Sequence, residues 1–444
     1  MFVSLRVDTS LMERWVLAEY DAVIIGAGIL GLATAYHVKK LKPYDKVLLV
    51  DMMGAAGQGN TAKSAAMYRC FFYSRTNLTL VDSSVEFYRY ASEKLGADLK
   101  LKWTGYLWLF AEKDYRDVEP VLKGMAERGL EYKIFDDKEL AEKLKMNTRV
   151  STDEEAAMMG LADANLGVLI PKAGSIEIDE LVKFYETEFK KMGGETRYGT
   201  RVESIMVDPE TSLGMPGEPY FWQNPHASGV KTNKGIFNAK KTIVAAGTWA
   251  STLLDQVGID PLMKPIKRQL FSVRANTEPL KQLLYTKGFT KQNCVPFTIL
   301  PNPRVYFKPA LEEDSFWFSY GDHFPRGFKS EDDPQAEENF YKYGIYQIVT
   351  KYFPQFMGCQ TNGSWAGQYA LNMLDGQPVI LEEDGIIVVG SCSGSGNMKA
   401  DAIGRIAAAL YAGQEYASLY GDKQFKVSDL GLKKRNVEPE KLII

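Results

Sequence analysis

The sequence predicts an α/β protein in which a Rossmann-like, dinucleotide-binding domain is joined to a second, α+β domain built on an antiparallel sheet. Three observations lead to this prediction. A strand, a glycine-rich turn and a helix follow each other from residue 21, the nucleotide-binding pattern returns twice later in the chain, and aromatic strands alternate between residues 263 and 323. A chain of 444 residues is long enough for two or three domains.

The first nucleotide-binding unit begins with the apolar run DAVII at residues 21–25, which is typical of a buried parallel strand. The turn GAGILG and a helical pattern follow, and a second apolar strand, KVLLV, leads into Asp51 and Met52. The turn supplies the residues expected at a pyrophosphate, which are Gly26, Gly28, Ile29, Leu30 and Gly31. Asp51 would accept hydrogen bonds from a ribose, which favours FAD or NAD over NADP.

The pattern returns at residues 173–205, a helix leading to a strand, and is followed by the strand KTIVAAGTWAS at 241–251. It returns again at residues 385–413, where a strand ends in a glycine- and serine-rich turn before a helix. This second turn brings another helix N-terminus to the same ligand region. It also argues against a nicotinamide dehydrogenase, whose cofactor domain usually occupies one continuous part of the chain.

The third observation concerns the segments LFSVRA, RVYFKPA and SFWFSYGDH, whose alternation of aromatic and polar residues predicts an antiparallel sheet. Residues 114–147 are expected to be mostly helical and to pack on the outside of that domain. The predicted division is an N-terminal extension, a discontinuous cofactor domain and a substrate domain. Their ranges are 1–20 for the extension, 21–95, 160–262 and 364–444 for the cofactor domain, and 96–159 and 263–363 for the substrate domain.

Composition narrows the function. With 53 Lys+Arg against 56 Asp+Glu, the net charge of -3 gives no basic footprint for a nucleic acid. Four scattered cysteines without a CxxC pair argue against a metal site or a disulfide framework. Residues 1–20 lack the apolar core of a signal peptide, and no run of 18 apolar residues occurs. We expect a cytoplasmic protein, with peripheral membrane contact and homo-oligomerisation left open.

Four ordered motifs make the chain resemble the FAD-dependent oxidoreductases of the D-amino-acid oxidase, glycine oxidase and sarcosine oxidase family. These motifs are DAVIIGAGILGLATAYH, TIVAAGTW, WAGQYALNMLDGQPVIL and SGSGNMKADAIGR. Within that family, KSAAMYRCFF, MNTRVS and SWAGQY resemble the archaeal dye-linked L-proline dehydrogenases. The resemblance implies a GR2-type flavoprotein fold with FAD as the cofactor.

The resemblance also places residues around FAD. It implies phosphate and ribityl contacts from Thr61, Ala62, Lys63 and Ser64, flavin-ring contacts from Ala66 and Met67, an adenine contact from the backbone of Val202, nucleotide contacts from Ala246, Gly247 and Trp249, and contacts at the flavin pyrimidine edge from Gly394, Ser395, Gly396, Asn397 and Met398. Family members with covalent flavin carry either a cysteine at the position of Gly367 or a histidine at the position of Lys63 or Ser64. Non-covalent FAD is therefore expected.

Lys399 also bears on the electron acceptor. It is offset by one residue from a family lysine that promotes reaction with oxygen, although it could still reach the flavin. The offset favours a dehydrogenase that passes electrons to a quinone, a carrier protein or an artificial dye. An oxygen-using oxidase of the amino-acid, sarcosine or glycine type stays open.

Arg69 is the candidate cation for a substrate carboxylate, because it stands in an apolar run and a guanidinium matches a carboxylate in bidentate fashion. A salt bridge within the protein is the alternative. The resemblance adds substrate contacts from the aromatic strands and nearby positions, namely Met67, Tyr306, Tyr320, His323 and Trp365, with packing within the protein as the alternative for the aromatic side chains.

The expected reaction is hydride transfer from the carbon beside a neutral amine to flavin N5, giving an imine that water opens. The substrate would be L-proline or a related amino acid. No catalytic residue is assigned, because a substrate bound as the free amine needs no general base. The rival functions are a 2-hydroxyglutarate or glycerol-3-phosphate dehydrogenase on the same FAD frame, and a non-catalytic FAD-carrying subunit.

Overall fold

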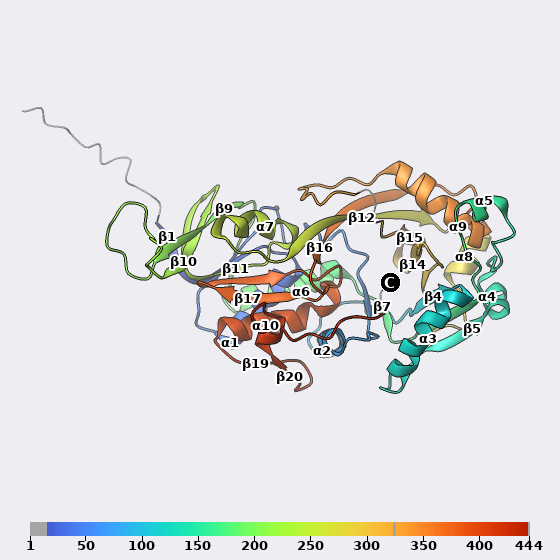
Figure 1. The fold of residues 1–444 in the computed structure, drawn as a ribbon, viewed down its shortest axis with the longest axis horizontal. Helices are drawn as coiled ribbons and strands as arrows, with labels where there is room; N and C mark the ends of the chain where they lie inside the picture. Colours follow the sequence, from blue (N-terminus) through green and yellow to red (C-terminus); the bar gives the residue numbers. More distant parts are fainter. Residues whose placement is uncertain (1–15, 323–325, 443–444) are drawn as a thin grey trace, which may run out of the picture.

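The computed structural model describes residues 16–322 and 326–442 and has a sheet at each end of an elongated molecule (Figure 1). The first sheet has the order β17-β18-β11-β1-β2-β8. Its parallel strands are β1 (Val16–Ile25), β2 (Val47–Val50), β8 (Glu195–Arg197), β11 (Gly235–Val244) and β18 (Ile386–Gly390). β17 (Val379–Glu383) pairs antiparallel to β18, and the hairpin of β9 (Val202–Pro209) and β10 (Pro225–Thr232) extends from β11.

Register brings the carboxyl ends of the central strands together. Ile25 lies opposite Val50 in β2 and Val244 in β11. Successive side chains of β1 point to opposite faces of the sheet. Ile24 therefore packs in one apolar core and Ile25 in the other.

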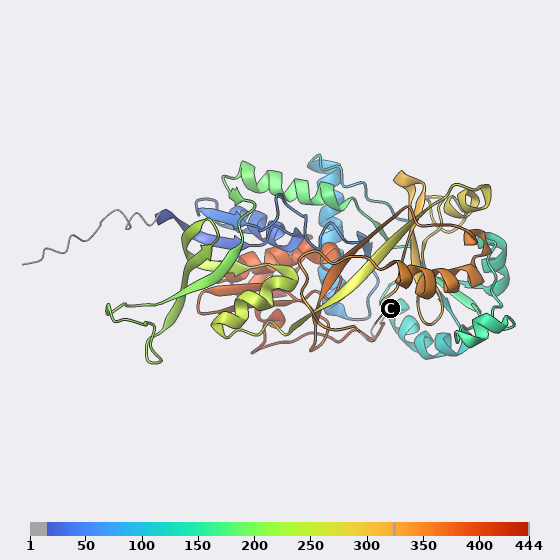
Figure 2. The same ribbon diagram turned by 90° about the horizontal axis from the view of Figure 1, so that it is seen from above.

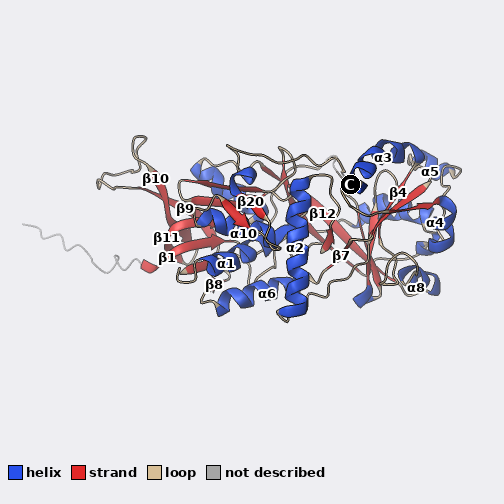
Figure 3. Ribbon diagram, turned by 90° about the horizontal axis from the view of Figure 1, so that it is seen from below, coloured by secondary structure: helices blue, strands red, loops and turns tan. Residues whose placement is uncertain are grey.

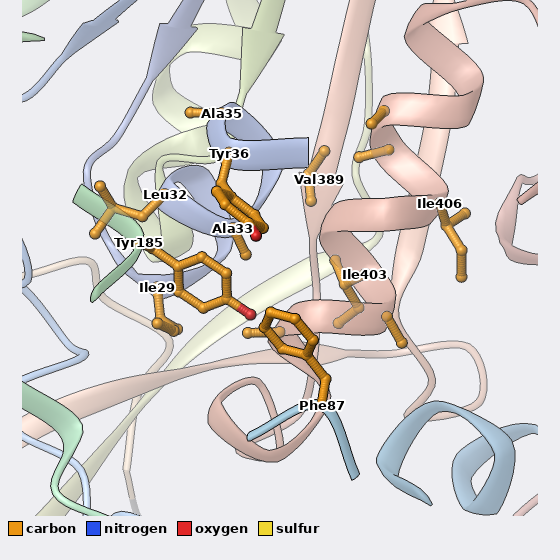
Figure 4. Close-up of a cluster of buried hydrophobic side chains, with 14 of the residues drawn as sticks. Ile29, Leu32, Ala33, Ala35, Tyr36, Phe87, Tyr185, Val389, Ile403 and Ile406 are labelled. Atoms are coloured by element: carbon orange, nitrogen blue, oxygen red, sulfur yellow. The ribbon is translucent and has the colours of Figure 1, made fainter. Parts of the chain in front are cut away.

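Four helices cover the face that Ile24 enters: α1 (Ile29–Leu41), α2 (Arg75–Lys94), α6 (Ile178–Lys191) and α10 (Ala400–Tyr411). Figure 4 shows their side chains meeting in one cluster, with Ile29, Leu32, Ala33, Ala35, Tyr36, Phe87, Tyr185, Val389, Ile403 and Ile406 labelled. Small residues let α1 and α10 approach closely, because a Cβ added at Gly404 would lie 2.6 Å from the backbone of Ala33. The short α7 (Ala250–Leu254) packs on the opposite face.

The second sheet has the order β16-β12-β15-β14-β13-β4-β6-β5. Its strands are β4 (Tyr106–Phe110), β5 (Lys133–Asp136), β6 (Leu166–Ile170), β12 (Met263–Arg274), β13 (Phe297–Ile299), β14 (Tyr306–Ala310), β15 (Ser315–Ser319) and β16 (Gly363–Asn372). All neighbours pair antiparallel except β13 and β4. The predicted fold class, a Rossmann-like domain with a second sheet-based domain, is confirmed.

The second sheet contains strands from segments that the predicted division did not assign to it. The helical reading of 114–147 omitted β5, although α3 (Glu112–Ala126) and α4 (Asp137–Leu144) do lie there. β6 and most of β16 fall within ranges predicted for the cofactor domain, yet they are hydrogen-bonded in the second sheet. Pairing between distant segments decides membership of a sheet, and a local pattern does not record it. Figure 2 shows the helices that flank this end, which also include α5 (Glu154–Met158), α8 (Glu278–Leu284) and α9 (Tyr346–Tyr352).

Short pairs complete the fold. β3 (Met67–Arg69) pairs with β7 (Ala173–Ser175) between the two sheets, and Figure 3 shows β7 beyond α2 on the way to the second sheet. β19 (Tyr416–Ser418) pairs with β20 (Gln424–Lys426). Across residues 16–322 and 326–442, no helix has both the length and the apolar character that crossing a membrane requires.

Candidate cofactor and substrate site

A cavity opens where the parallel strands of the first sheet end, which is the usual ligand position in such sheets. Most of the predicted cofactor residues line it: Gly26, Gly28, Ile29, Leu30, Asp51, Met52, Thr61, Lys63, Ser64, Val202, Ala246, Gly247, Trp249, Gly394, Gly396 and Asn397. Ala62 and Trp365 line an adjoining pocket. Gly31, Ser395, Met398 and Lys399 are not among the lining residues, although they belong to the same two turn–helix segments.

The first glycine turn requires glycine for two physical reasons. Gly26 has a φ of 105°, and a Cβ there would lie 2.5 Å from the carbonyl oxygen of Ala245. A Cβ at Gly31 would lie 1.8 Å from the carbonyl oxygen of Gly26, so α1 could not start this close to β1. The turn is also fixed from outside, because the Ile29 amide donates to Thr61 Oγ1 at 3.1 Å. The backbone is therefore packed closely against both Gly26 and Gly31.

Asp51 lies at the cavity edge directly after β2. Its carboxylate accepts hydrogen bonds from the amides of Ala27 at 2.6 Å and Met53 at 2.7 Å. Burial raises the pKa of Asp51, while these two amides oppose that rise. The carboxylate is thus held in place and lies among the lining residues.

We call residues 59–67 the cofactor strip. Its residues Gly59, Asn60, Thr61, Lys63 and Ser64 line the cavity, whereas Ala66 and Met67, predicted at the flavin ring, are not among the lining residues. Asn397 donates to Ser64 Oγ at 2.7 Å, and Ser64 Oγ in turn accepts from the Ala66 amide at 3.0 Å. Ala66 has a φ of 52°, which is unusual for a residue other than glycine. This strained turn leads directly into β3 and Arg69.

In the second glycine turn, three residues have a left-handed backbone conformation. Their φ angles are 57° at Ser391, 49° at Ser393 and 82° at Gly394. A Cβ at Gly394 would lie 2.4 Å from the ring of Tyr369, so the aromatic ring rests directly on the turn. Turns of this kind point successive backbone amides outward and suit anionic groups.

Arg69 is buried, and its guanidinium carbon lies 4.3 Å from the centroid of the Phe72 ring and 5.5 Å from that of Trp108. Its Nη1 has no hydrogen-bond partner in the part of the chain that the structure describes. A buried donor without a partner is costly. Arg69 is not among the residues that line the cavity, and its Nη1 is a buried donor that an added acceptor would satisfy.

Three aromatic rings make tilted contacts in the apolar cluster that also holds Trp108, over which Arg69 lies. The ring centroids of Tyr106 and Phe297 are 4.4 Å apart, and those of Phe297 and Tyr306 are 4.9 Å apart. Burial raises the pKa of Tyr306, so its phenol stays neutral at ordinary pH. Met67 packs in the same apolar cluster.

Two of the other predicted substrate residues, Tyr320 and Trp365, lie outside that apolar cluster. Tyr320 stacks on Phe340 with centroids 6.1 Å apart, on the side of the second sheet's own core. The indole of Trp365 donates to the carbonyl oxygen of Lys63 at 3.3 Å, which fastens the second sheet to the cofactor strip. His323 lies outside the described residues.

Sequence reasoning missed two cations. Lys308 is buried on β14, on the same face as Tyr306, and donates to the carbonyl oxygen of Ala65 at 2.8 Å. Burial lowers the pKa of Lys308 to about 8. Arg268 of β12 lines the cavity, with its guanidinium 5.4 Å from the Tyr369 ring. Lys308 could have been found as a lone cation in the apolar strand YFKPA, whereas Arg268 stands beside Lys267 and Gln269 and gave no such signal.

Lys399 is also buried. It donates to Asn77 Oδ1 at 2.5 Å and to Ser395 Oγ at 2.7 Å. Burial lowers the pKa of Lys399 to about 8. Its ammonium group lies 5.3 Å from the centroid of the Phe72 ring, on which Arg69 also rests.

A loop after β15 closes over the nucleotide end of the cavity, and we call residues 329–332 the strap. Asp332 accepts from the indole of Trp249 at 2.7 Å and from Arg201 at 2.9 Å. Gln368 of β16 donates to the carbonyl oxygen of Lys329 at 2.5 Å. The cavity thus takes its walls from both sheets.

Comparison with known proteins agrees with this geometry. A family profile described as "DAO: FAD dependent oxidoreductase" matches residues 21–410. The chain is 21% identical to an L-2-hydroxyglutarate dehydrogenase of Indibacter alkaliphilus over 355 residues, which cover 77% of this chain and 78% of that protein.

Two solved structures share the fold. The crystal structure of L-proline dehydrogenase from P. horikoshii has a TM-score of 0.70 at 19% identity, with 90% of this chain and 95% of that chain covered. The crystal structure of glycine oxidase from Geobacillus kaustophilus has a TM-score of 0.69 at 19% identity, with 90% and 96% covered.

Proposed function

Because this chain belongs to the FAD-dependent oxidoreductase (DAO) family, we propose that it oxidises L-proline or a related amino acid and passes the electrons to an acceptor other than oxygen. The observation that carries the proposal is Arg69. It is a buried guanidinium with an unpartnered Nη1, next to aromatic rings and at the end of the cofactor strip. A carboxylate would supply the missing partner.

FAD fits the residues present. Asp51 would accept a hydrogen bond from a ribose, the two glycine turns would donate from their backbone amides to phosphate and flavin oxygens, and the helix N-terminus at Ile29 would stabilise a pyrophosphate. A Cβ at Gly367 would lie 2.7 Å from the Cβ of Lys63. A cysteine for covalent attachment would clash there, which supports non-covalent FAD.

The protein's own residues bind and orient the substrate. Arg69 holds the carboxylate, and the rings of Tyr106, Phe297 and Tyr306 provide an apolar wall against which a ring or short side chain packs. Bound FAD supplies the chemistry by accepting a hydride from the carbon beside the amine. Holding the substrate by its carboxylate and by its ring or side chain accounts for most of the rate enhancement expected here.

The direct test is an anaerobic titration of the yellow holoenzyme with L-proline. We expect the flavin absorbance to bleach, and an artificial dye to restore it faster than air does. If L-proline leaves the flavin oxidised, a panel of other amino acids identifies the substrate. If the panel fails too, the amino-acid proposal is wrong.

A 2-hydroxy acid is the second candidate, favoured by the similarity to an L-2-hydroxyglutarate dehydrogenase. Arg69 would hold the carboxylate of a hydroxy acid equally well. Dye reduction with L-2-hydroxyglutarate, compared with L-proline under the same conditions, separates the two.

A further inference from the structure

The C-terminal segment, residues 432–442, returns to the substrate side of the molecule. In Figure 1 the red C-terminal chain runs from the first sheet towards β7 and β4. Near its end, Glu440 accepts hydrogen bonds from the amide of Tyr73 at 3.0 Å and from Asn77 Nδ2 at 3.2 Å. Leu442 then packs into the apolar cluster that contains Met67 and Tyr306.

Two buried cations lie near this segment. Arg69 and Lys399 approach the same Phe72 ring, at 4.3 and 5.3 Å from its centroid. Like charges brought together in a buried site repel each other, and each also loses hydration. Both effects lower the pKa of Lys399.

Glu440 is connected to both cations. The Asn77 amide bridges it to Lys399, because Asn77 Nδ2 donates to Glu440 and Asn77 Oδ1 accepts from the Lys399 ammonium. The charge of Glu440 also acts on Arg69. One carboxylate therefore faces two cations, and the group of three carries a net charge of about +1 before any ligand binds.

We propose that Glu440, a positioning residue in the C-terminal segment, lowers the net positive charge of the substrate pocket. It thereby weakens the affinity of the pocket for carboxylate ligands. The inference rests on the proposed function, in which Arg69 binds the substrate carboxylate. Without the negative charge, both cations would attract an external carboxylate more strongly.

Glu438 provides a matched control. It belongs to the same segment and binds the same start of α2, where its carboxylate accepts from the Arg75 amide and its carbonyl oxygen accepts from Ser74 Oγ. Within residues 16–322 and 326–442, Glu438 forms no hydrogen bond or ion pair with Asn77 or Lys399. Loss of its charge therefore tests the structural role of the segment alone.

The experiment uses isothermal titration of the holoenzyme at pH 6.5 with cyclopentanecarboxylate and with its neutral isostere cyclopentanecarboxamide. For Glu440→Gln we expect the carboxylate to bind on the order of five- to tenfold more tightly, with the amide unchanged. For Glu438→Gln we expect both affinities to stay at the wild-type value. Flavin content and thermal midpoint check that each variant is folded.

The results separate the two proposals. If the wild type binds neither compound, the carboxylate pocket of the proposed function is wrong. If the wild type binds the carboxylate but Glu440→Gln changes both compounds alike, or neither, the inference about Glu440 is overturned alone. Should Glu440→Gln not fold, Glu440→Asn in the full chain must show the same charge-selective gain, and its absence also overturns the inference.

Discussion

The nucleotide half and the proposed substrate half of the site are built in different ways. The nucleotide half is made largely of the turns that follow strands β1, β2, β11 and β18. The substrate half collects side chains from β3, β4, β13, β14, α2 and the C-terminal segment. A substitution that changes the shape of a turn disturbs the backbone itself. A substitution of one side chain in the other half can leave the fold intact.

The largest effect should come from the nucleotide half. A side chain at Gly31 meets the Gly26 carbonyl oxygen at 1.8 Å, which is backbone and cannot rotate away. Gly31→Val should therefore lose nearly all bound FAD and lower the thermal midpoint by several degrees. The ratio of flavin to protein absorbance and circular dichroism measure the two effects.

Gly124→Ala is the control, since a Cβ in that α3 position meets nothing within 4 Å. It should keep its flavin and gain slightly in stability, because alanine is the better helix former. A Gly31→Val protein with normal flavin content would contradict the close packing of α1 on β1.

This difference also explains what the sequence could predict. The glycine turns and Asp51 lie within single local units, so spacing located them, and the family resemblance added most of the other predicted residues that line the cavity. The charged groups near Arg69 include Lys399 and Glu440, which lie up to 371 residues away in the chain. Strand partners of β4 and β6 were missed for the same reason, since a local pattern does not name its neighbour.

Arg69→Met should have the next largest effect, and on the substrate half alone. Loss of a charge-assisted, bidentate contact is expected to weaken cyclopentanecarboxylate binding on the order of 100-fold. Flavin content should stay at the wild-type value, because Arg69 is not among the residues that line the nucleotide cavity. Titration calorimetry on the holoenzyme measures the affinity.

Arg75→Met, at an exposed position six residues further on, should bind as the wild type does. If Arg69→Met retained full affinity, Arg268 or Lys308 would become the candidate cation for the carboxylate.

Lys399 should give a smaller, pH-dependent effect. Its pKa is lowered to about 8 by burial. Below pH 8 the ammonium group is charged and attracts a carboxylate, and as pH rises through 8 it loses its proton and that attraction. Affinity for cyclopentanecarboxylate should fall about tenfold between pH 6.5 and 9.5 in the wild type. Lys399→Met should flatten this profile, and a profile that keeps its step would assign the titration to another group.

The strap should give the smallest effect, because it touches the nucleotide half from the second sheet through exposed contacts. Asp332→Ala removes the hydrogen bonds to Trp249 and Arg201 at 2.7 and 2.9 Å. More than half of the Arg201 and Asp332 side chains is exposed, so we expect FAD to dissociate only a few times faster. Fluorescence of released flavin after dilution measures that rate. Asp333→Ala, whose carboxylate accepts from Gln335 in its own turn, should release FAD at the wild-type rate. Equal acceleration in both variants would mean that the loop as a whole, and not the Asp332 contacts, retains the nucleotide.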